Sequence, residues 1–291
     1  MNARLTIWSD FRRIGRDSLS RAARGLCLFA LAALAHPAAV MADYVSAVLD
    51  DGPIGYWRLN ETAGNTAANI GSLGNAAEGT YVSVVDQNDA GPPAAPGLGV
   101  GNTAMGVGPG DGSVQTGQSI LSNLSAFTMS AFIKPADRAA DRIGLFGQND
   151  AIEFGFISPD TVQIWTPGGG SLNVTYPFPA DEWHHIATVG NGTNLTVYFD
   201  GQPAGTGGGV TGNYGSSGFG FNIGGGGVYD GTGNQFTGSI DEVAVFDKAL
   251  TENQILAHIA ASQEPIIPEP STLVLAALGL LGVVGMRRRR R

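Results

Sequence analysis

Short runs of apolar residues, separated by turn-forming residues, recur along the middle of the chain. The clearest pair is Trp183 to Val189 and Leu195 to Phe199, which flank Asn191-Gly192-Thr193-Asn194. Asparagine and glycine tolerate positive φ and reverse the chain, so this segment predicts a β-hairpin. Asp200-Gly201 supplies a second reversal and predicts a third strand from about Gln202. Apolar side chains fall on both alternation phases of the first strand, as expected for a strand covered on two sides.

Similar runs predict many further short strands. They are expected at Gly55 to Leu59, Tyr81 to Val85, Ala104 to Val107, Ser113 to Gln115, Phe127 to Lys134, Ile143 to Gly147, Ile152 to Ile157, Val162 to Thr166, Leu172 to Val174, Phe219 to Ile223 and Phe236 to Phe246. Residues 60–101, rich in Gly, Ala, Asn and Pro, predict a long surface excursion around the strand near Tyr81. This rhythm predicts an all-β fold, a two-sheet antiparallel β-sandwich of jelly-roll type.

Two short helices are expected at the ends of this sandwich. Tyr44 to Asp51 predicts a short helix or lead-in turn, which Gly52-Pro53 ends. Near the other end, Thr251-x-x-Gln254 is a capping box and predicts a helix to about Ala261.

The N-terminal end of the chain differs in composition from the middle. Residues 1–24 carry six arginines, Gly25 to Ala35 is apolar, and small residues precede Asp43. This order predicts a secretory signal peptide over residues 1–42, cleaved between Ala42 and Asp43, and therefore export. Arg12-Arg13 leaves the general secretory route and the twin-arginine route open.

The C-terminal end combines a short motif, an apolar segment and a basic tail. Residues 263–271 form a linker with Pro268, Glu269 and Pro270, and residues 272–291 hold an apolar run that ends in Arg287, Arg288, Arg289 and two further arginines. At about 1.5 Å per residue, the run from Leu273 to Met286 spans about 21 Å, short of the ~30 Å hydrocarbon core. The arginines are expected to stay cytoplasmic and leave the middle of the chain outside.

The middle of the chain is strongly acidic. The whole chain has a formal charge of -9, but residues 43–267 contain 5 basic and 22 acidic residues, a balance of -17. Such a surface repels phosphate backbones, so no nucleic-acid partner is expected. The one cysteine, Cys27, lies in the predicted signal peptide, so the exported domain is predicted to fold without a disulfide.

Three motifs resemble those of one family. Trp183-His184-His185-Ile186-Ala187, followed by Leu195 to Gly201, resembles the W-H-H-V-A and L-Y-V-D-G motifs of laminin-G-like, concanavalin A-type jelly rolls. Tyr56 to Glu61 resembles that family's Y-W-R-L-D-E opening, and Gly238 to Val243 its closing G-x-I-D-E-V strand. The resemblance implies one laminin-G-like domain over residues 43–262. Phe132 is a departure, because the family usually has Trp there.

The C-terminal features resemble a PEP-CTERM sorting signal. The resemblance implies transient insertion of the apolar segment into the inner membrane of a Gram-negative bacterium and processing by an exosortase-like enzyme. It also implies delivery to the cell surface or the extracellular matrix. A permanent tail anchor is the alternative.

Asp241 is the candidate metal ligand. It interrupts the apolar pattern of a long strand, where an ionised carboxylate needs hydrogen-bond donors or a cation. The resemblance implies one structural Ca²⁺, held by this aspartate and backbone carbonyls. Binding of Asp241 to backbone N–H groups is the alternative. His184 and His185 are adjacent, so they are expected to face opposite sides of a strand and to pack rather than chelate.

The acidic residues do not predict catalysis. Related jelly rolls include laminarinase-type glucanases, which carry E-x-D-x-x-E on one strand. Asp241-Glu242 are adjacent and expected on opposite faces, and Asp150-x-x-Glu153 spans a turn. Neither pair reproduces the catalytic spacing, so the chain is predicted not to be an enzyme.

Aromatic residues are the candidates for ligand binding. Trp165, Tyr176, Tyr214 and Tyr229 could stack on sugar rings, and the Gly-rich surroundings of the last two predict exposure. The sequence therefore predicts an exported, non-catalytic adhesion or carbohydrate-binding module with an extracellular polysaccharide or a surface protein as its partner. A glycan-active hydrolase and a purely structural matrix protein are the alternatives.

Overall fold

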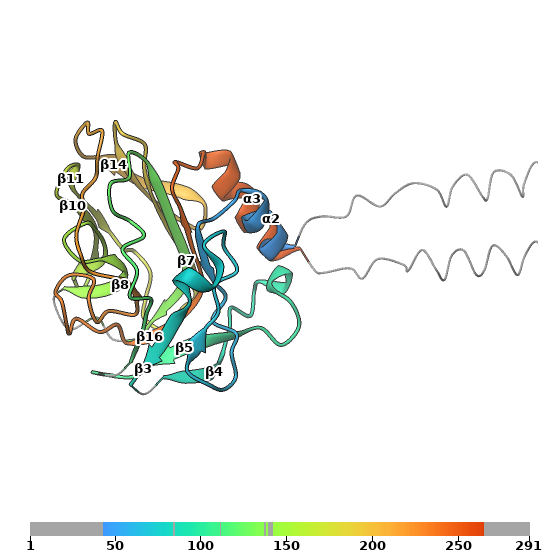
Figure 1. The fold of residues 1–291 in the computed structure, drawn as a ribbon. Coiled ribbons are helices and arrows are strands. Elements are labelled where there is room, and N and C mark those ends of the chain that lie inside the picture. Colours follow the sequence, from blue (N-terminus) through green and yellow to red (C-terminus); the bar gives the residue numbers. More distant parts are fainter. Residues whose placement is uncertain (1–42, 84, 111, 137, 139–141, 265–291) are drawn as a thin grey trace, which may run out of the picture. The chain divides into compact units, whose positions relative to one another are not determined.

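The computed structural model describes residues 43–264, except residues 84, 111, 137 and 139–141. Within this range, two antiparallel sheets pack face to face (Figure 1). Sheet A contains, from edge to edge, β14 (Gln202–Gly207), β13 (Leu195–Phe199), β12 (His184–Gly190), β7 (Phe127–Pro135), β16 (Gly238–Phe246), β5 (Thr103–Val107) and β4 (Asp86–Ala90), and β1 (Gly55–Trp57) also pairs with β16. Sheet B contains β11 (Gly170–Thr175), β10 (Thr161–Thr166), β9 (Ile152–Ser158), β8 (Ile143–Gln148), β15 (Phe221–Ile223), β6 (Ser113–Gln115), β3 (Gly79–Val82) and β2 (Thr66–Ala67). The predicted all-β sandwich is confirmed.

The main core lies between the two sheets and is rich in aromatic side chains. Trp57 of sheet A stacks on Phe221 of sheet B, with ring centroids 5.1 Å apart and an interplanar angle of 17°. The Trp57 indole N–H donates to the Ala77 carbonyl at 3.0 Å, so its polar atom is satisfied inside the core. The opening motif, Tyr56 to Glu61, therefore supplies a residue that joins the two sheets.

The central hairpin forms as the sequence predicts. β12 and β13 pair in the antiparallel sense around residues 191–194. Asp200 and Gly201 have φ of 48° and 80°, so they form a two-residue turn with positive φ at both positions before β14. β12 is covered on both sides, because Ile186 points into the main core and Ala187 into a second apolar cluster.

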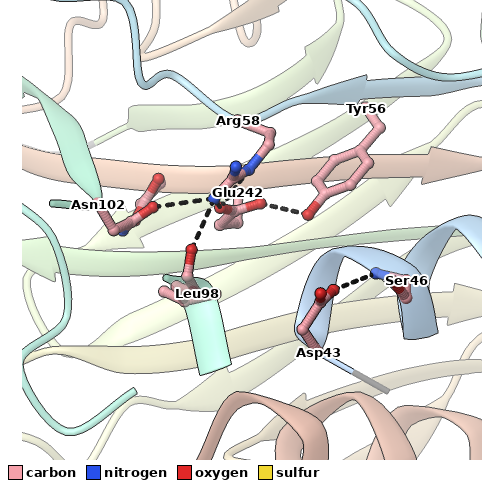
Figure 2. Close-up of polar contacts among 8 residues, drawn as sticks. Asp43, Ser46, Tyr56, Arg58, Leu98, Asn102 and Glu242 are labelled. Atoms are coloured by element: carbon pink, nitrogen blue, oxygen red, sulfur yellow. Dashed lines mark hydrogen bonds and ion pairs between the residues drawn. The ribbon is translucent and has the colours of Figure 1, made fainter. Parts of the chain in front are cut away.

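Two helices cover the outer side of sheet A. α2 (Tyr44–Asp50) and α3 (Glu252–Gln263) lie side by side there (Figure 1). Asp43, the predicted first residue after signal cleavage, caps α2 by accepting from the Ser46 N–H at 2.7 Å (Figure 2). The predicted Thr251–Gln254 capping box begins α3. Under the helices, the second cluster includes Tyr44, Phe132, Tyr198, Phe246 and Ile255.

Residues 60–101 are built into the sandwich, so the predicted surface excursion is wrong. β4 pairs with β5 at one edge of sheet A, and β2 and β3 extend sheet B. The short 3₁₀-helices η1 (Gly74–Ala77) and η2 (Pro96–Leu98) complete the segment. A Cβ on Gly97 would lie 1.9 Å from the Ala261 carbonyl, so η2 packs closely on α3. The apolar pattern missed β4 because its sequence, Asp-Gln-Asn-Asp-Ala, is polar.

Candidate functional site

Two carboxylates lie buried side by side in the middle of β16. Asp241 and Glu242 are each 0% exposed. β16 carries an extra residue relative to β7 between Asp241 and Ala244, and Glu242 has a left-handed φ of 54°. This β-bulge turns Glu242 to the same outer side of sheet A as Asp241. The expectation that the two face opposite sides is therefore wrong, because it assumed a regular strand.

Arg58 neutralises Glu242. Its Nη2 and Nε donate to Glu242 Oε1 at 2.8 and 2.9 Å, and the Tyr56 hydroxyl donates to Oε2 (Figure 2). Arg58 Nη2 also donates to the Leu98 carbonyl at 2.9 Å. Tyr56 and Arg58 come from the opening motif and Glu242 from the closing motif, so the two motifs meet in one ion pair, in which Glu242 is buried and Arg58 is 27% exposed. The pair serves the fold, because the Glu242 carboxylate is closed to solvent.

Asp241 lacks a cation of its own. One of its oxygens accepts from Asn102 Nδ2 at 2.5 Å, and the other has no partner among the described residues. Burial, and then the neighbouring charge of Glu242, raise the pKa of Asp241 well above its usual value. Burial therefore favours the protonated form of Asp241 more than water does.

The oxygen atoms here do not fit a calcium ion as they are arranged. Calcium takes about six to eight oxygen ligands. Both Glu242 oxygens accept from Arg58 or Tyr56, and the Asn102 amide oxygen accepts from Arg58 at 3.2 Å. Within the described ranges, no group of three or more His, Cys, Asp or Glu side chains could hold a metal. Calcium at Asp241 stays a prediction, because Arg58, Tyr56 and Asn102 occupy three of the four carboxylate oxygens and one Asp241 oxygen has no partner among the described residues.

A groove of about 590 Å³ lies on the same outer side of sheet A. It is lined by Pro92, Pro93, Ala94, Ala95, Phe132, Asp181, Glu182, Trp183, His184, His185, Asp200, Ile259, Ser262 and Gln263. His185 pairs with Phe132, and Phe132 with Asp241, across β12, β7 and β16. Phe132 therefore separates the groove from the buried carboxylates. The segment before η2 forms one wall, and the last turn of α3 forms another.

The rim of the groove is acidic. Asp181, Glu182 and Asp200 are exposed, and none of the lining residues is Lys or Arg. Asp200 Oδ2 lies 2.8 Å from His184 Nδ1, and its Oδ1 accepts from the His185 N–H at 2.9 Å. Trp183 is partly exposed at the rim, with Lys134 Nζ 5.5 Å from its ring centroid. The groove thus combines an aromatic ring with several hydrogen-bond acceptors.

His184 and His185 face opposite sides of β12, as the sequence predicts. His184 stacks on Phe178 with centroids 3.5 Å apart. His185 packs edge-on against Phe132 at 5.1 Å, on the groove side, and is 1% exposed. Burial lowers the pKa of His185 to about 3, so its imidazole is neutral. Neither of its ring nitrogens has a hydrogen-bond partner among the described residues, which is unusual for a buried polar group.

Sequence reasoning did not find this groove. Its floor comes from Phe132 and His185 on neighbouring strands, which only the register brings together. One wall comes from residues 92–95, which the sequence assigned to a surface excursion. The Trp-His-His motif was the available signal, but it indicated the fold rather than a site.

The predicted tyrosines are buried, so the expectation of exposure is wrong. Tyr214 is 0% exposed, packs edge-on against Phe127 at 4.9 Å and accepts from the Gly192 N–H through its hydroxyl. Tyr229 is 4% exposed, and its hydroxyl donates to the Gln163 carbonyl. Their glycine-rich segments fold back onto the sandwich instead of extending into solvent. Tyr176 is also buried.

Trp165 is partly exposed on the outer side of sheet B. Its neighbours Val162 and Ile164 point into the main core, and Glu153 lies across from Trp165 on β9. Tyr229 contacts the strand of Trp165, because its hydroxyl donates to the Gln163 carbonyl of β10. Tyr214 lies in the main core. Trp165 and Asp241 therefore lie on different sheets and form no common site.

The fold resembles that of several solved binding domains. Domain 4 of AbnA, a GH43 extracellular arabinanase from Geobacillus stearothermophilus solved with arabinotriose, is 16% identical, with a TM-score of 0.53 over 71% of this chain and 98% of that one. The botulinum neurotoxin type C structure from work on ganglioside-dependent cell entry is 16% identical, with a TM-score of 0.52 over 74% of this chain and 52% of that one. The binding domain of Paraclostridial Mosquitocidal Protein 1 is 12% identical, with a TM-score of 0.53 over 72% and 52% of the two chains. The chain thus spans about half of the toxin chains, and at these identities the similarity establishes the fold alone. A comparison with curated proteins found no match.

The C-terminal signal is confirmed by its family. Residues 267–290 match the PEP-CTERM protein-sorting motif, which includes Pro268, Glu269, Pro270 and Arg287 to Arg289. The motif indicates export through the inner membrane of a Gram-negative bacterium to the cell surface, and it implies processing by an exosortase. These residues and Ala42 lie outside the described part of the chain. None of the helices in residues 43–264, gaps aside, has the length and apolar character to cross a membrane.

The domain itself is identified by a second match. Residues 108–256, just over half of the chain, match the model of the laminin-G family of concanavalin A-like lectins and glucanases. The match includes the Trp-His-His motif, the groove floor and the buried pair of β16. The chain therefore belongs to the concanavalin A-like lectin/glucanase superfamily.

Proposed function

We propose that this domain is a non-catalytic carbohydrate-binding module of an exported surface protein, and that the groove beside Trp183 binds the sugar. The main support for this proposal is the groove, in which Trp183 and Phe132 lie beside three carboxylates. An aromatic ring covers the apolar face of a pyranose, and carboxylates accept from its hydroxyl groups. Its volume of about 590 Å³ is in the range of small-ligand sites. An extracellular polysaccharide is the partner that the surface location favours.

The buried carboxylates support binding rather than hydrolysis. Glycosidases need two carboxyl groups that flank a bound glycosidic bond. Asp241 and Glu242 are 0% exposed, and Glu242 is tied to Arg58, so neither reaches a substrate. In the groove, Asp181 and Glu182 are sequence neighbours at the rim, and Asp200 is bound to His184.

One observation favours the alternative of a glycan-active hydrolase. Burial raises the pKa of Glu153 to about 7, a value that suits a general acid, and Glu153 lies across from Trp165. Release of reducing ends from a bound polysaccharide, lost in a Glu153→Gln variant, would support this alternative.

A glycan array tests the proposed function. The protein expressed from the full sequence is screened with and without a calcium chelator. We expect sugar binding that Trp183→Ala reduces about tenfold, the loss of one aromatic contact of about 1.4 kcal/mol, while Trp165→Ala leaves it unchanged. Binding that only Trp165→Ala removes would move the site to sheet B. Binding to no glycan would favour the structural matrix protein, and loss of binding with the chelator would support the predicted Ca²⁺.

A further inference from the structure

We infer that the groove selects a positively charged amino sugar, whose ammonium group binds at the acidic rim. This inference rests on the proposed glycan-binding function and names the class of sugar. Three features of the groove favour such a ligand: two of them attract a cation, the third offers hydrogen-bond partners, and each comes from a different part of the fold.

The first feature is the set of exposed carboxylates. The Glu182 and Asp200 side chains lie 3.6 and 2.8 Å from His184, but they are 58% and 46% exposed, so part of each remains accessible to a ligand. Asp181 stands beside them, and none of the described lining residues is Lys or Arg; Lys134 is not among them, although its Nζ lies 5.5 Å from the Trp183 ring centroid. Charges gathered at one cleft focus a negative potential there. A ligand cation would add a full counter-charge to these three carboxylates.

The second feature is the end of α3. The helix ends at Gln263, which lines the groove, and its C-cap residue is Glu264. A helix C-terminus carries roughly half a negative charge. The last turn of α3 contains no basic residue, so this partial charge is not balanced within the helix. The C-terminal end of α3 therefore adds to the attraction that the carboxylates exert on a cation.

The third feature is His185. This buried side chain lines the groove, and its two ring nitrogens have no partner among the described residues. A neutral imidazole offers one acceptor and one donor. An ammonium group can donate to the acceptor nitrogen and a hydroxyl group can accept from the ring N–H, so an amino sugar carries both kinds of partner. A simple inorganic cation could satisfy only the acceptor.

The apolar floor and the acidic rim together distinguish the classes of sugar. Phe132 and Trp183 can cover the apolar face of a pyranose, and a cation near an aromatic ring gains further attraction. A uronic acid would place its carboxylate against the acidic rim, where like charges repel. An N-acetylated sugar fits the floor but brings no charge. The groove thus ranks amino sugars first and uronic acids last.

Titration calorimetry tests this ranking with three probes: a glucosamine tetramer, an N-acetylglucosamine tetramer and a galacturonic acid tetramer. We expect the full protein to bind the glucosamine tetramer at least about tenfold more tightly than the acetylated one, with weaker binding at high salt. The double variant Asp181→Asn, Glu182→Gln should lose this preference. Asp160→Asn, which removes an exposed carboxylate from a turn of sheet B, is the matched control and should keep it.

The outcomes separate the inference from the proposed function. Equal affinity for the acetylated and the glucosamine tetramers, or a preference that survives in the double variant, overturns the amino-sugar inference and leaves a glycan site. Tighter binding of the galacturonic acid tetramer overturns it as well. No binding of any tetramer overturns the inference, and the proposed function falls with it only if the glycan array also shows no binding. Tighter binding of a lysine tetrapeptide than of the glucosamine tetramer would show a peptide site instead.

Discussion

Two acidic clusters lie on the same side of sheet A, and they are built in opposite ways. Asp241 and Glu242 are fully buried, and Arg58, Tyr56 and Asn102 occupy three of their four oxygens. Asp181, Glu182 and Asp200 are exposed around a groove whose described lining residues include no Lys or Arg, although Lys134 Nζ lies 5.5 Å from the Trp183 ring centroid. Phe132 separates the two clusters.

The difference shows which cluster serves the fold and which is available to a ligand. A buried charge is costly unless the protein supplies its counter-charge, and for Glu242 the opening motif supplies Arg58. An exposed carboxylate has no such requirement, because water solvates it. The groove can therefore keep its carboxylates exposed, with His184 beside Glu182 and Asp200 instead of a buried counter-charge. Substitutions of Arg58, Asp241 and Phe132 test this difference.

The largest effect is expected from Arg58→Ala. The substitution leaves Glu242 buried without a cation, so we expect a loss of about 3 to 5 kcal/mol in the free energy of unfolding, measured by urea denaturation. Arg58→Lys keeps the charge but not the two parallel hydrogen bonds, and it should lose less. A loss below about 1 kcal/mol for Arg58→Ala would show that the ion pair does not support the fold.

The second prediction concerns Asp241 and pH. Its folded-state pKa is raised, whereas an unfolded Asp has a pKa of about 3.9. Between these two values the folded state keeps a proton that the unfolded state has lost, so stability falls as the pH rises. This fall amounts to about 1.4 kcal/mol for each unit by which the pKa is raised.

Asp241→Asn should remove this part of the pH dependence, because the amide cannot ionise. Urea denaturation at pH 4 and pH 7.5 measures it as the difference between the variant and the wild type. Asp160→Asn serves again as the control and should keep the wild-type dependence. If the free energy of unfolding of Asp241→Asn changed with pH as much as that of the wild type, Asp241 would have to stay ionised when buried.

The smallest effect on stability is expected from Phe132→Trp. The family usually has Trp at this position, so the fold should accept it with a loss of at most about 3 kcal/mol in the free energy of unfolding. The larger ring would extend into the groove above the floor, and we expect sugar affinity to fall about tenfold while the buried pair is unchanged. Unchanged affinity would show that the sugar does not reach the floor.

The fold was largely predictable from the sequence, and the groove was not. The strands around Asn191-Gly192 and Asp200-Gly201 follow from turn chemistry, which is local. Glu242 is the instructive failure, since its left-handed backbone places it beside Asp241 and no spacing rule anticipates a bulge. The exposure of Tyr214 and Tyr229 was misjudged because glycine-rich segments pack as readily as they extend. The groove depends on register and on the packing of residues 92–95 against α3, which are long-range properties.

The most direct test uses the tryptophan indole N–H signals in a nitrogen–proton correlation spectrum. The chain has four tryptophans, and three of them lie in the described domain: Trp57 in the core, Trp165 on sheet B and Trp183 at the groove. On titration with the glucosamine tetramer, we predict a saturable shift of the Trp183 signal, while those of Trp57 and Trp165 stay in place. A shift of Trp165 with Trp183 unmoved would contradict the assignment of the groove as the binding site.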